Sequence, residues 1–184
     1  MPLTQIDPQS ALVVIDLQLG IVGTPTATPS QEIVNRSAEL ARAFRAKNLP
    51  VVLVNVTGAA PGRNDLGRPT MAFAENWAEL APGLDAKPSD ILITKQSWGA
   101  FLGTSLHDSL QKLGVTQIVM AGISTSAGVE STARSAFDLG YNVVFVTDAM
   151  TDRSAEAHQN SVERIFPRLG ETCVTRNVIE FLAK

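Results

Sequence analysis

The sequence predicts an α/β fold of three layers, in which a six-stranded parallel sheet lies between two layers of helices. Short, unbroken apolar runs alternate along the chain with longer segments of helical periodicity. Unbroken apolar runs are typical of strands that are buried on both faces, as in parallel sheets. Strands that alternate with helices imply right-handed crossovers. The 184 residues contain no repeat and no linker-like segment, so we expect a single domain over residues 1–184.

The first half of the chain contains three of the expected strands, at residues 11–15 (ALVVI), 51–56 (VVLVNV) and 91–94 (ILIT). A helix is expected between the first two strands, from an N-cap at Ser30 to about Asn48. The connection over residues 58–87 is rich in turn residues and carries at most a short helical piece. Its length is typical of a functional loop or lid.

The second half contains the other three strands, at residues 116–121, 142–146 and 171–174, and helices at residues 104–113, 127–139, 154–168 and 177–183. Small residues form a tight corner after the strand at 116–121, namely Ser124, Thr125, Ser126 and Gly128. The first N–H groups of a helix lack intrahelical partners, so this corner favours a bound anion. The alternative is an ordinary loop with a Ser or Thr N-cap.

Composition argues against several classes of partner and cofactor. A net charge of -3, with scattered Lys and Arg, predicts no nucleic-acid partner. No apolar run approaches the roughly 20 residues that span a bilayer, and the N-terminus lacks signal-peptide features, so we expect a cytoplasmic protein without a membrane partner. The single Cys173 is expected to be a buried apolar residue. With only His107 and His158, no metal site is expected.

Three features converge on one edge of the predicted sheet. Asp16 follows the first strand, Lys95 follows the third, and the corner at residues 124–128 follows the fourth. Ligands of such sheets bind outside the carboxyl ends of the strands, where the strand order reverses. Asp16 and Lys95 could pair there, and burial would give their protonation states catalytic meaning. The alternative is that each charge simply faces solvent at the end of its strand.

Three long segments resemble the isochorismatase-like cysteine hydrolases: LVVIDLQLG, ILITKQSWGAFLGTSLHDSLQKLGV and IVMAGISTSAGVESTARSAFDLGYNVVFVTDAMTD. The resemblance implies a six-stranded parallel sheet, a small-molecule substrate, and a homodimer or larger homo-oligomer. Most members use an Asp, Lys, Cys triad, and Asp16 and Lys95 match its first two members. Gly128 stands at the position of the cysteine, which excludes the usual thioester chemistry because glycine carries no nucleophile.

Glycine at this position is similar to true isochorismatases, which hydrolyse a vinyl ether without a covalent intermediate. The resemblance implies that Asp16 is the general acid, that Gly128 makes room for a bulkier substrate, and that no cofactor is needed. The Asp and His metal ligands of nicotinamidases have no match after Asp16. Lys95 favours the carboxylate form of Asp16 and so opposes its role as an acid, unless the substrate's carboxylate occupies the ammonium.

Substrate selection matches the family less closely. Isochorismatases bind substrate carboxylates with a Gln and an Arg from the region after the second strand. Here that region offers Arg63 and Arg68 but no Gln, and an arginine could make a bidentate carboxylate contact. Further candidates for substrate contact are the corner residues and three aromatic residues that could line an apolar pocket: Ser124, Thr125, Ser126, Trp77, Trp98 and Phe101.

Two alternatives stay open beside the vinyl-ether hydrolase. One is an amide hydrolase with Ser126 or Ser124 as nucleophile, for which Lys95 would be the base because the sequence places no histidine nearby. The other is a catalytically silent binding protein that keeps Asp16 and Lys95 as a buried ion pair. Similar folds often have a non-proline cis peptide after the fourth strand, which predicts one near Ile123 and Ser124.

Overall fold

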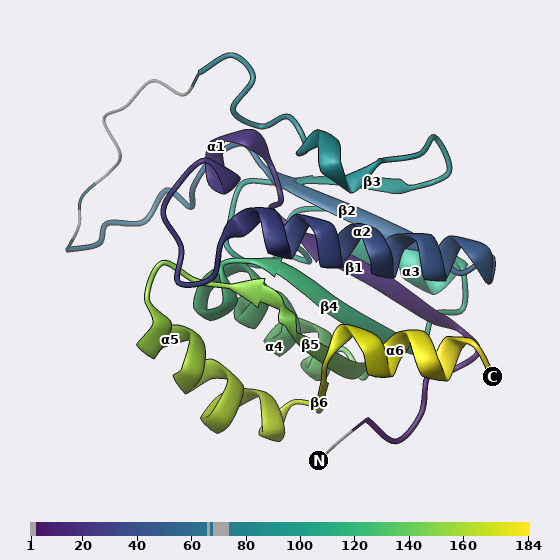
Figure 1. Ribbon diagram of the computed structural model, residues 1–184. Coiled ribbons are helices and arrows are strands. Elements are labelled where there is room, and N and C mark those ends of the chain that lie inside the picture. Colours follow the sequence, from purple (N-terminus) through teal and green to yellow (C-terminus); the bar gives the residue numbers. More distant parts are fainter. Residues whose placement is uncertain (1–2, 66, 68–73) are drawn as a thin grey trace.

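The computed structural model describes residues 3–65, 67 and 74–184 (Figure 1). Within these residues one six-stranded sheet has the order β3-β2-β1-β4-β5-β6, with every neighbouring pair parallel. The predicted fold class is therefore confirmed. β1 and β4 lie side by side, so the strand order reverses between them. The strands are β1 (Ser10–Ile15), β2 (Val51–Val56), β3 (Ile91–Lys95), β4 (Gln117–Ile123), β5 (Asn142–Thr151) and β6 (Glu171–Cys173).

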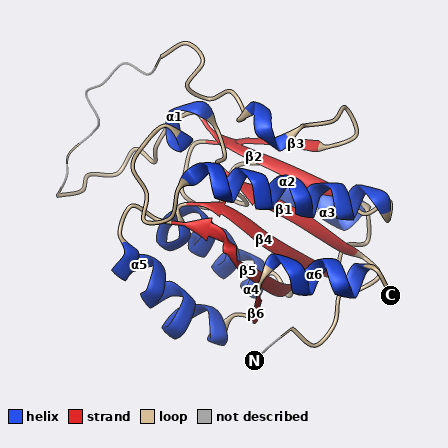
Figure 2. Cartoon of the chain, in the orientation of Figure 1, coloured by secondary structure: helices blue, strands red, loops and turns tan. Residues whose placement is uncertain are grey.

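Helices cover both faces of the sheet (Figure 2). α2 and α6 lie on one face, and α3 and α4 lie on the other. The α-helices are α1 (Leu19–Val22), α2 (Ser30–Ala46), α3 (Leu106–Lys112), α4 (Glu130–Asp138), α5 (Ala155–Asn160) and α6 (Thr175–Leu182). Shorter helical turns are η1 (Pro82–Leu84), η2 (Thr125–Val129), η3 (Ser161–Ile165) and η4 (Phe166–Arg168).

β1 lies between two hydrophobic cores, because its side chains alternate between the faces of the sheet. Leu12 and Val14 join the core beneath α2 and α6, which also contains Phe44. Val13 and Ile15 join the core beneath α3 and α4. Burial of the Phe44 ring alone contributes about 1.5–3 kcal/mol. Because β1 is packed on both faces, the residue that follows it is held in a fixed place.

A glycine allows β4 to approach β1 closely at the carboxyl edge of the sheet. Gly122 has φ +120, and a Cβ added to it would lie 2.1 Å from the carbonyl oxygen of Ile15. Only glycine fits this contact. β4 continues to Ile123, beyond the predicted end at residue 121, and β5 continues to Thr151 rather than residue 146.

Two predicted helices are divided in the structure. The helix expected over residues 127–139 begins earlier, with the π-helical turn η2, and continues as α4. The helix expected over residues 154–168 consists of α5, η3 and η4. Pro167 lies in η4, and its missing N–H group cannot donate a helical hydrogen bond.

The later part of the connection from β2 to β3 is fixed to the start of the chain. Gln18 forms an antiparallel bridge with Leu80, and its side-chain Nε2 donates to the carbonyl oxygens of Val56 and Trp77. The indole of Trp77 covers Gly20, where an added Cβ would lie 1.9 Å from Cδ1 of the ring. Residues 66 and 68–73 of the predicted lid lie outside the described residues, so a lid function stays a prediction.

Among the residues that the structure describes, no helix combines the length and the apolar character needed to cross a membrane.

Candidate active site

Asp16 follows β1 directly and lies at the switch point between β1 and β4. Its backbone N–H donates to the carbonyl oxygen of Val54 at 2.9 Å. The residue has φ +53, a left-handed conformation that Asp tolerates better than most residues. Only 4% of Asp16 is exposed, so the end of β1 carries a carboxyl group that is almost fully removed from water.

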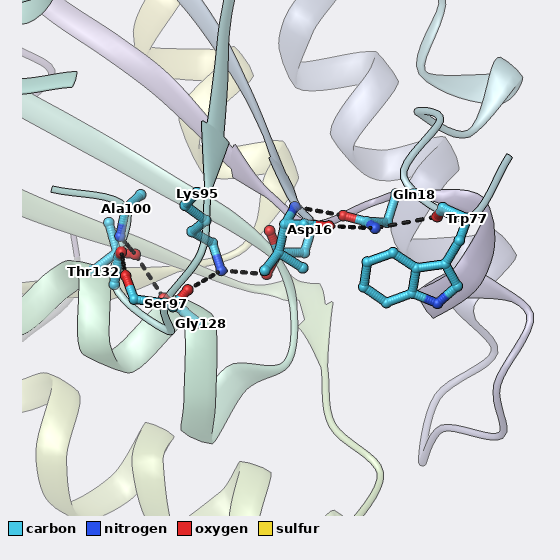
Figure 3. Close-up of polar contacts among 10 residues, drawn as sticks. Asp16, Gln18, Trp77, Lys95, Ser97, Ala100, Gly128 and Thr132 are labelled. Atoms are coloured by element: carbon cyan, nitrogen blue, oxygen red, sulfur yellow. Dashed lines mark hydrogen bonds and ion pairs between the residues drawn. The ribbon is translucent and has the colours of Figure 1, made fainter. Parts of the chain in front are cut away.

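Lys95 reaches this carboxyl group from β3, past the end of β2, which lies between β3 and β1. Its Nζ donates to Oδ2 of Asp16 at 2.7 Å and to the carbonyl oxygen of Ser97 at 3.0 Å (Figure 3). Lys95 is 2% exposed. The pairing of these two residues, expected from their positions at strand ends, is confirmed. The alternative that both charges face solvent is wrong.

Burial dominates the electrostatics of Asp16. Desolvation raises the pKa of its carboxyl group to about 6, against the opposing charge and hydrogen bond of Lys95. Among the described residues, Oδ1 of Asp16 has no hydrogen-bond partner. The carboxyl group therefore has one oxygen held by Lys95 and one available to carry a proton.

Gly128, in η2, lies directly against this carboxyl group. A Cβ added to Gly128 would lie 2.9 Å from Cγ2 of Ile15 and 3.1 Å from Oδ2 of Asp16. The carbonyl oxygen of Gly128 accepts a hydrogen bond from Oγ1 of Thr132 at 2.7 Å, and that hydroxyl accepts from the N–H of Ala100 at 3.0 Å (Figure 3). The missing side chain is thus what allows the turn to pack so closely against Asp16.

The corner after β4 is largely occupied by contacts within the chain. The peptide bond between Ile123 and Ser124 is cis, as predicted. The carbonyl oxygen of Ser124 accepts hydrogen bonds from the N–H groups of Ala127 and Val129. The N–H and Oγ of Ser126 both donate to Oδ2 of one carboxylate at 2.8 Å, that of Asp152. The expectation that these amides hold a substrate anion is therefore wrong for Ser126 and Ala127.

Two residues at this corner were not anticipated from the sequence. Asp152, which follows β5, caps Ser126, and Nδ1 of His158 on α5 lies 2.8 Å from Oγ1 of Thr125. Burial lowers the pKa of His158, while the charge of Asp152 opposes this shift. The signal was present in the topology: β5 is the neighbour of β4, so the segment after β5 meets the same edge of the sheet.

The aromatic and arginine residues predicted to contact substrate lie in different parts of the structure. Trp77 packs over Gly20, whereas Trp98 is 67% exposed, and its carbonyl oxygen would lie 3.6 Å from a Cβ at Gly128. Arg63 is exposed, and Arg68 lies outside the described residues.

Phe101 requires a correction, because its ring packs against those of Tyr141 and His107, with centroid separations of 5.9 and 6.3 Å. Tyr141 immediately precedes β5, so Phe101 contacts the amino-terminal edge of the sheet rather than lining a pocket beside Asp16.

Cys173 is buried, as expected, at the end of the edge strand β6. Burial, together with the charges of Asp148 and Glu171, raises the pKa of its thiol to about 12. This thiol is therefore unsuited to nucleophilic attack. Among the described residues, no group of three or more His, Cys, Asp or Glu side chains could hold a metal ion.

The isochorismatase domain model matches residues 10–177 of this chain. The chain belongs to the isochorismatase family. It is 45% identical to the isochorismatase family protein YecD of Escherichia coli O157:H7, over 94% of each chain. It is 39% identical to the family protein YwoC of Bacillus subtilis, over 94% of this chain and 93% of that protein. A solved isochorismatase family structure from Burkholderia thailandensis is 40% identical, with a TM-score of 0.94 over 98% of both chains.

Family members with named activities are more distant relatives. An isochorismatase of Bacillus subtilis is 28% identical over 96% of this chain and 59% of its own length. Ureidoacrylate amidohydrolase RutB of Variovorax paradoxus is 28% identical over 87% of this chain and 75% of its own length. The chain is a hydrolase of this family. Its relatives include one named as an isochorismatase and one named as an amidohydrolase.

Proposed function

We propose that this isochorismatase-family hydrolase acts without a covalent cysteine intermediate, with Asp16 as general acid, on a small vinyl ether or carboxylated substrate such as isochorismate. The observation that carries the proposal is the buried carboxyl group of Asp16, whose pKa of about 6 leaves about half of it protonated at pH 6 and about a tenth at pH 7. Enzymes commonly raise the pKa of a catalytic carboxylic acid by burial in this way.

The two oxygens of Asp16 have different roles in the proposed reaction. Oδ2 is held by Lys95, while Oδ1 carries the proton. The acid transfers this proton to the terminal vinyl carbon, and the electron pair of the double bond forms the new C–H bond. The product is an oxocarbenium ion, and Asp16 becomes a carboxylate that Lys95 stabilises.

Water completes the hydrolysis. It adds to the oxocarbenium carbon and loses a proton, which restores the acid form of Asp16. The resulting hemiketal breaks its C–O bond to release pyruvate and an alcohol, when the substrate is isochorismate. Each turnover consumes one water and needs no cofactor, since no electrons are transferred to or from the protein.

Gly128 supports this mechanism rather than a thioester route. From the resemblance to the cysteine hydrolases we take Gly128 to stand at the position of their nucleophile. The backbone of Gly128 faces Oδ2 of Asp16, and Ile15 leaves little room for a side chain at this position. Gly128 therefore offers no thiol beside Asp16, and a thioester intermediate cannot form at this position.

A substrate carboxylate requires a cation near the acid. Nζ of Lys95 donates two hydrogen bonds, to Oδ2 of Asp16 and to the carbonyl oxygen of Ser97. Its third N–H is the one that could donate to a substrate oxygen. We propose that Arg63, from the loop after β2, supplies a second contact when substrate binds. The backbone carbonyl of Trp98 lies near Gly128, and we propose that the exposed indole of this residue contacts the substrate's carbon atoms.

A second candidate function is amide hydrolysis with Ser126 as nucleophile. One observation favours it: Oγ of Ser126 donates to the carboxylate of Asp152 at 2.8 Å, so an acceptor for its proton is in place. A carboxylate is a weak base for a serine hydroxyl, however, and Oδ2 of Asp152 already accepts the N–H of Ser126. The pair is therefore better suited to hold the corner than to activate a nucleophile.

The deciding assay measures pyruvate release from isochorismate by the wild-type protein and by Asp16→Ala and Asp16→Asn. We expect turnover by the wild type and its loss in both variants. Asp138→Asn, at an exposed position on α4, is the matched control and should retain full turnover. Wild-type turnover that survives Asp16→Asn would contradict the role of Asp16.

A separate variant distinguishes the two bond cleavages. Ser126→Ala keeps the backbone N–H bond to Asp152, so it should leave most of the pyruvate release intact if Asp16 is the acid. Turnover of ureidoacrylate by the wild type that is lost in Ser126→Ala would favour the amide hydrolase instead. Absence of turnover with either compound would indicate a different substrate or a binding protein on the same fold.

We further propose that the protein acts on a small molecule as a homodimer or larger homo-oligomer. Several large apolar side chains near β3 are exposed in the single chain, namely Leu92 at 66%, Trp98 at 67% and Leu102 at 78%. Light scattering coupled to size exclusion tests the assembly, and a monomeric mass would contradict it.

A further inference from the structure

The π-helical turn η2 is held by side chains from two other segments, one in α5 and one after β5. Thr125, its first residue, is fully buried, and its Oγ1 lies 2.8 Å from Nδ1 of His158. Ser126, its second residue, is fixed by two hydrogen bonds to Asp152. These contacts come from α5 and from the end of β5, so the turn depends on packing against a distant part of the chain.

The same turn carries Gly128, whose backbone lies against Oδ2 of Asp16. The carbonyl oxygen of Ser124 accepts hydrogen bonds from both Ala127 and Val129, which ties the residues of the turn together. These bonds close the turn on both sides of Gly128, so a displacement at Thr125 would be expected to move Gly128 as well. Because Gly128 helps to exclude water from Asp16, such a displacement would hydrate the carboxyl group.

We propose that His158, acting through Thr125, is a positioning residue that holds η2 against Asp16. The hydroxyl of Thr125 is fully buried, so it is placed to receive support from the imidazole rather than to attack a substrate. Nothing in the proposed chemistry uses His158 directly, and its part is to keep Gly128 in place. The inference rests on the proposed role of Asp16, but its first test needs no substrate.

The test measures the pKa of Asp16 by NMR titration of protein carrying carbon-13 in its Asp carboxyl groups. Asp16→Asn assigns the resonance. The informative variant is Thr125→Val, which removes the hydroxyl and keeps the shape of the side chain. We expect the pKa of Asp16 to fall by about one unit, because hydration favours the carboxylate. Lys95 is the ionisable group that pairs with Asp16, and it is unchanged in this variant.

Three further variants make the result specific. Thr125→Ser keeps the hydroxyl and should restore the wild-type pKa of Asp16. His158→Gln, at a half-buried position, should lower that pKa as Thr125→Val does. Ser154→Ala removes the N-cap hydrogen bond of α5, the helix that carries His158. In this bond Oγ of Ser154 accepts from the N–H of Ala157, so the variant leaves Thr125 and His158 unchanged. It should lower thermal stability without changing the pKa of Asp16.

The kinetic readout is used once a substrate is turned over. Thr125→Val and His158→Gln should lower kcat by about ten- to a hundredfold with KM little changed, as expected for a misplaced reacting group. The proposal is overturned if Asp16 titrates in Thr125→Val and His158→Gln as it does in the wild type. If Thr125→Val does not fold, His158→Gln alone decides. Failure of the wild type to release pyruvate would count against the proposed function, while the titration would still test the positioning role.

Discussion

Nζ of Lys95 lies 2.7 Å from Oδ2 of Asp16, although the strands that carry them, β3 and β1, are separated by β2. The long lysine side chain spans the end of the intervening strand and meets a carboxyl group that is almost fully buried. Burial raises the pKa of that carboxyl group and the ammonium lowers it, and burial has the larger effect. The balance between these two residues is the basis for the first two predictions.

Activity of the wild-type protein should fall as the pH rises through about 6. A general acid works in its protonated form, and the pKa of Asp16 is raised to about 6. The protonated fraction is therefore nearly complete at pH 5 and decreases about tenfold per pH unit well above the pKa. A profile of kcat/KM against pH for pyruvate release checks this. A rate that instead rises with a pKa near 6 would mean that Asp16 acts as a base.

Lys95→Met should shift this descending limb to higher pH. Both contributions of Lys95, its charge and its hydrogen bond, lower the pKa of Asp16, so their removal leaves burial unopposed and raises the pKa above 6. Titration of the labelled Asp16 carboxyl group provides the measurement. Lys87→Met, at an exposed lysine paired with Asp85, is the control and should leave the titration unchanged. An unshifted pKa in Lys95→Met would show that the ion pair does not control the acid.

Gly128→Ala should destabilise the fold and lower activity. Replacement of glycine by alanine in a helix gains up to about 1 kcal/mol, but overpacking of a tight site costs about 1–3 kcal/mol. The added Cβ would lie 2.9 Å from Cγ2 of the fully buried Ile15 and 3.1 Å from Asp16, so the overpacking cost should exceed the gain. Urea denaturation measures the net effect. Gly62→Ala, where an added Cβ meets nothing within 4 Å, should be close to neutral.

The thiol of Cys173 should not react with iodoacetamide in the folded protein. Its pKa is raised to about 12 and the residue is 8% exposed, so almost no thiolate is present at pH 8. Mass spectrometry should find the native protein unmodified and the urea-unfolded protein fully alkylated. Cys173→Ala should retain turnover, and a loss of kcat in that variant with an intact fold would reopen a thiol mechanism.

Arg45→Ala should cost about 3–5 kcal/mol of folding free energy. Arg45 makes two hydrogen bonds to Asp90, from Nε at 2.9 Å and from Nη2 at 2.6 Å, and the carboxylate side chain is only 1% exposed. Removal of the guanidinium leaves a buried carboxylate with no cation beside it, although the backbone N–H of Lys87 still donates to its Oδ2 at 2.8 Å. Arg176→Ala breaks an exposed pair with Glu180 and should leave the urea midpoint unchanged. Equal midpoints for the two variants would contradict the distinction between buried and exposed pairs.

The sequence alone determined the fold and the centre of the candidate site. Strand periodicity, helix periodicity and the order of elements are local properties, so the parallel sheet followed from them. Asp16, Lys95 and the corner at residues 124–128 could be located from the predicted ends of their strands, because the carboxyl ends of parallel strands meet at one edge of the sheet. The resemblance to the cysteine hydrolases singled out Gly128 within that corner.

The partners of the corner residues were decided by the tertiary structure. Asp152 caps Ser126, and His158 supports Thr125, because the extended β5 places the following segment beside the end of β4. The same applies to Phe101, which packs on Tyr141 at the opposite edge. Which side chain meets which depends on strand lengths, register and packing between residues far apart in the chain. The position of Asp16 at the end of β1 could thus be read from the sequence, whereas only the folded chain decided which side chains surround it.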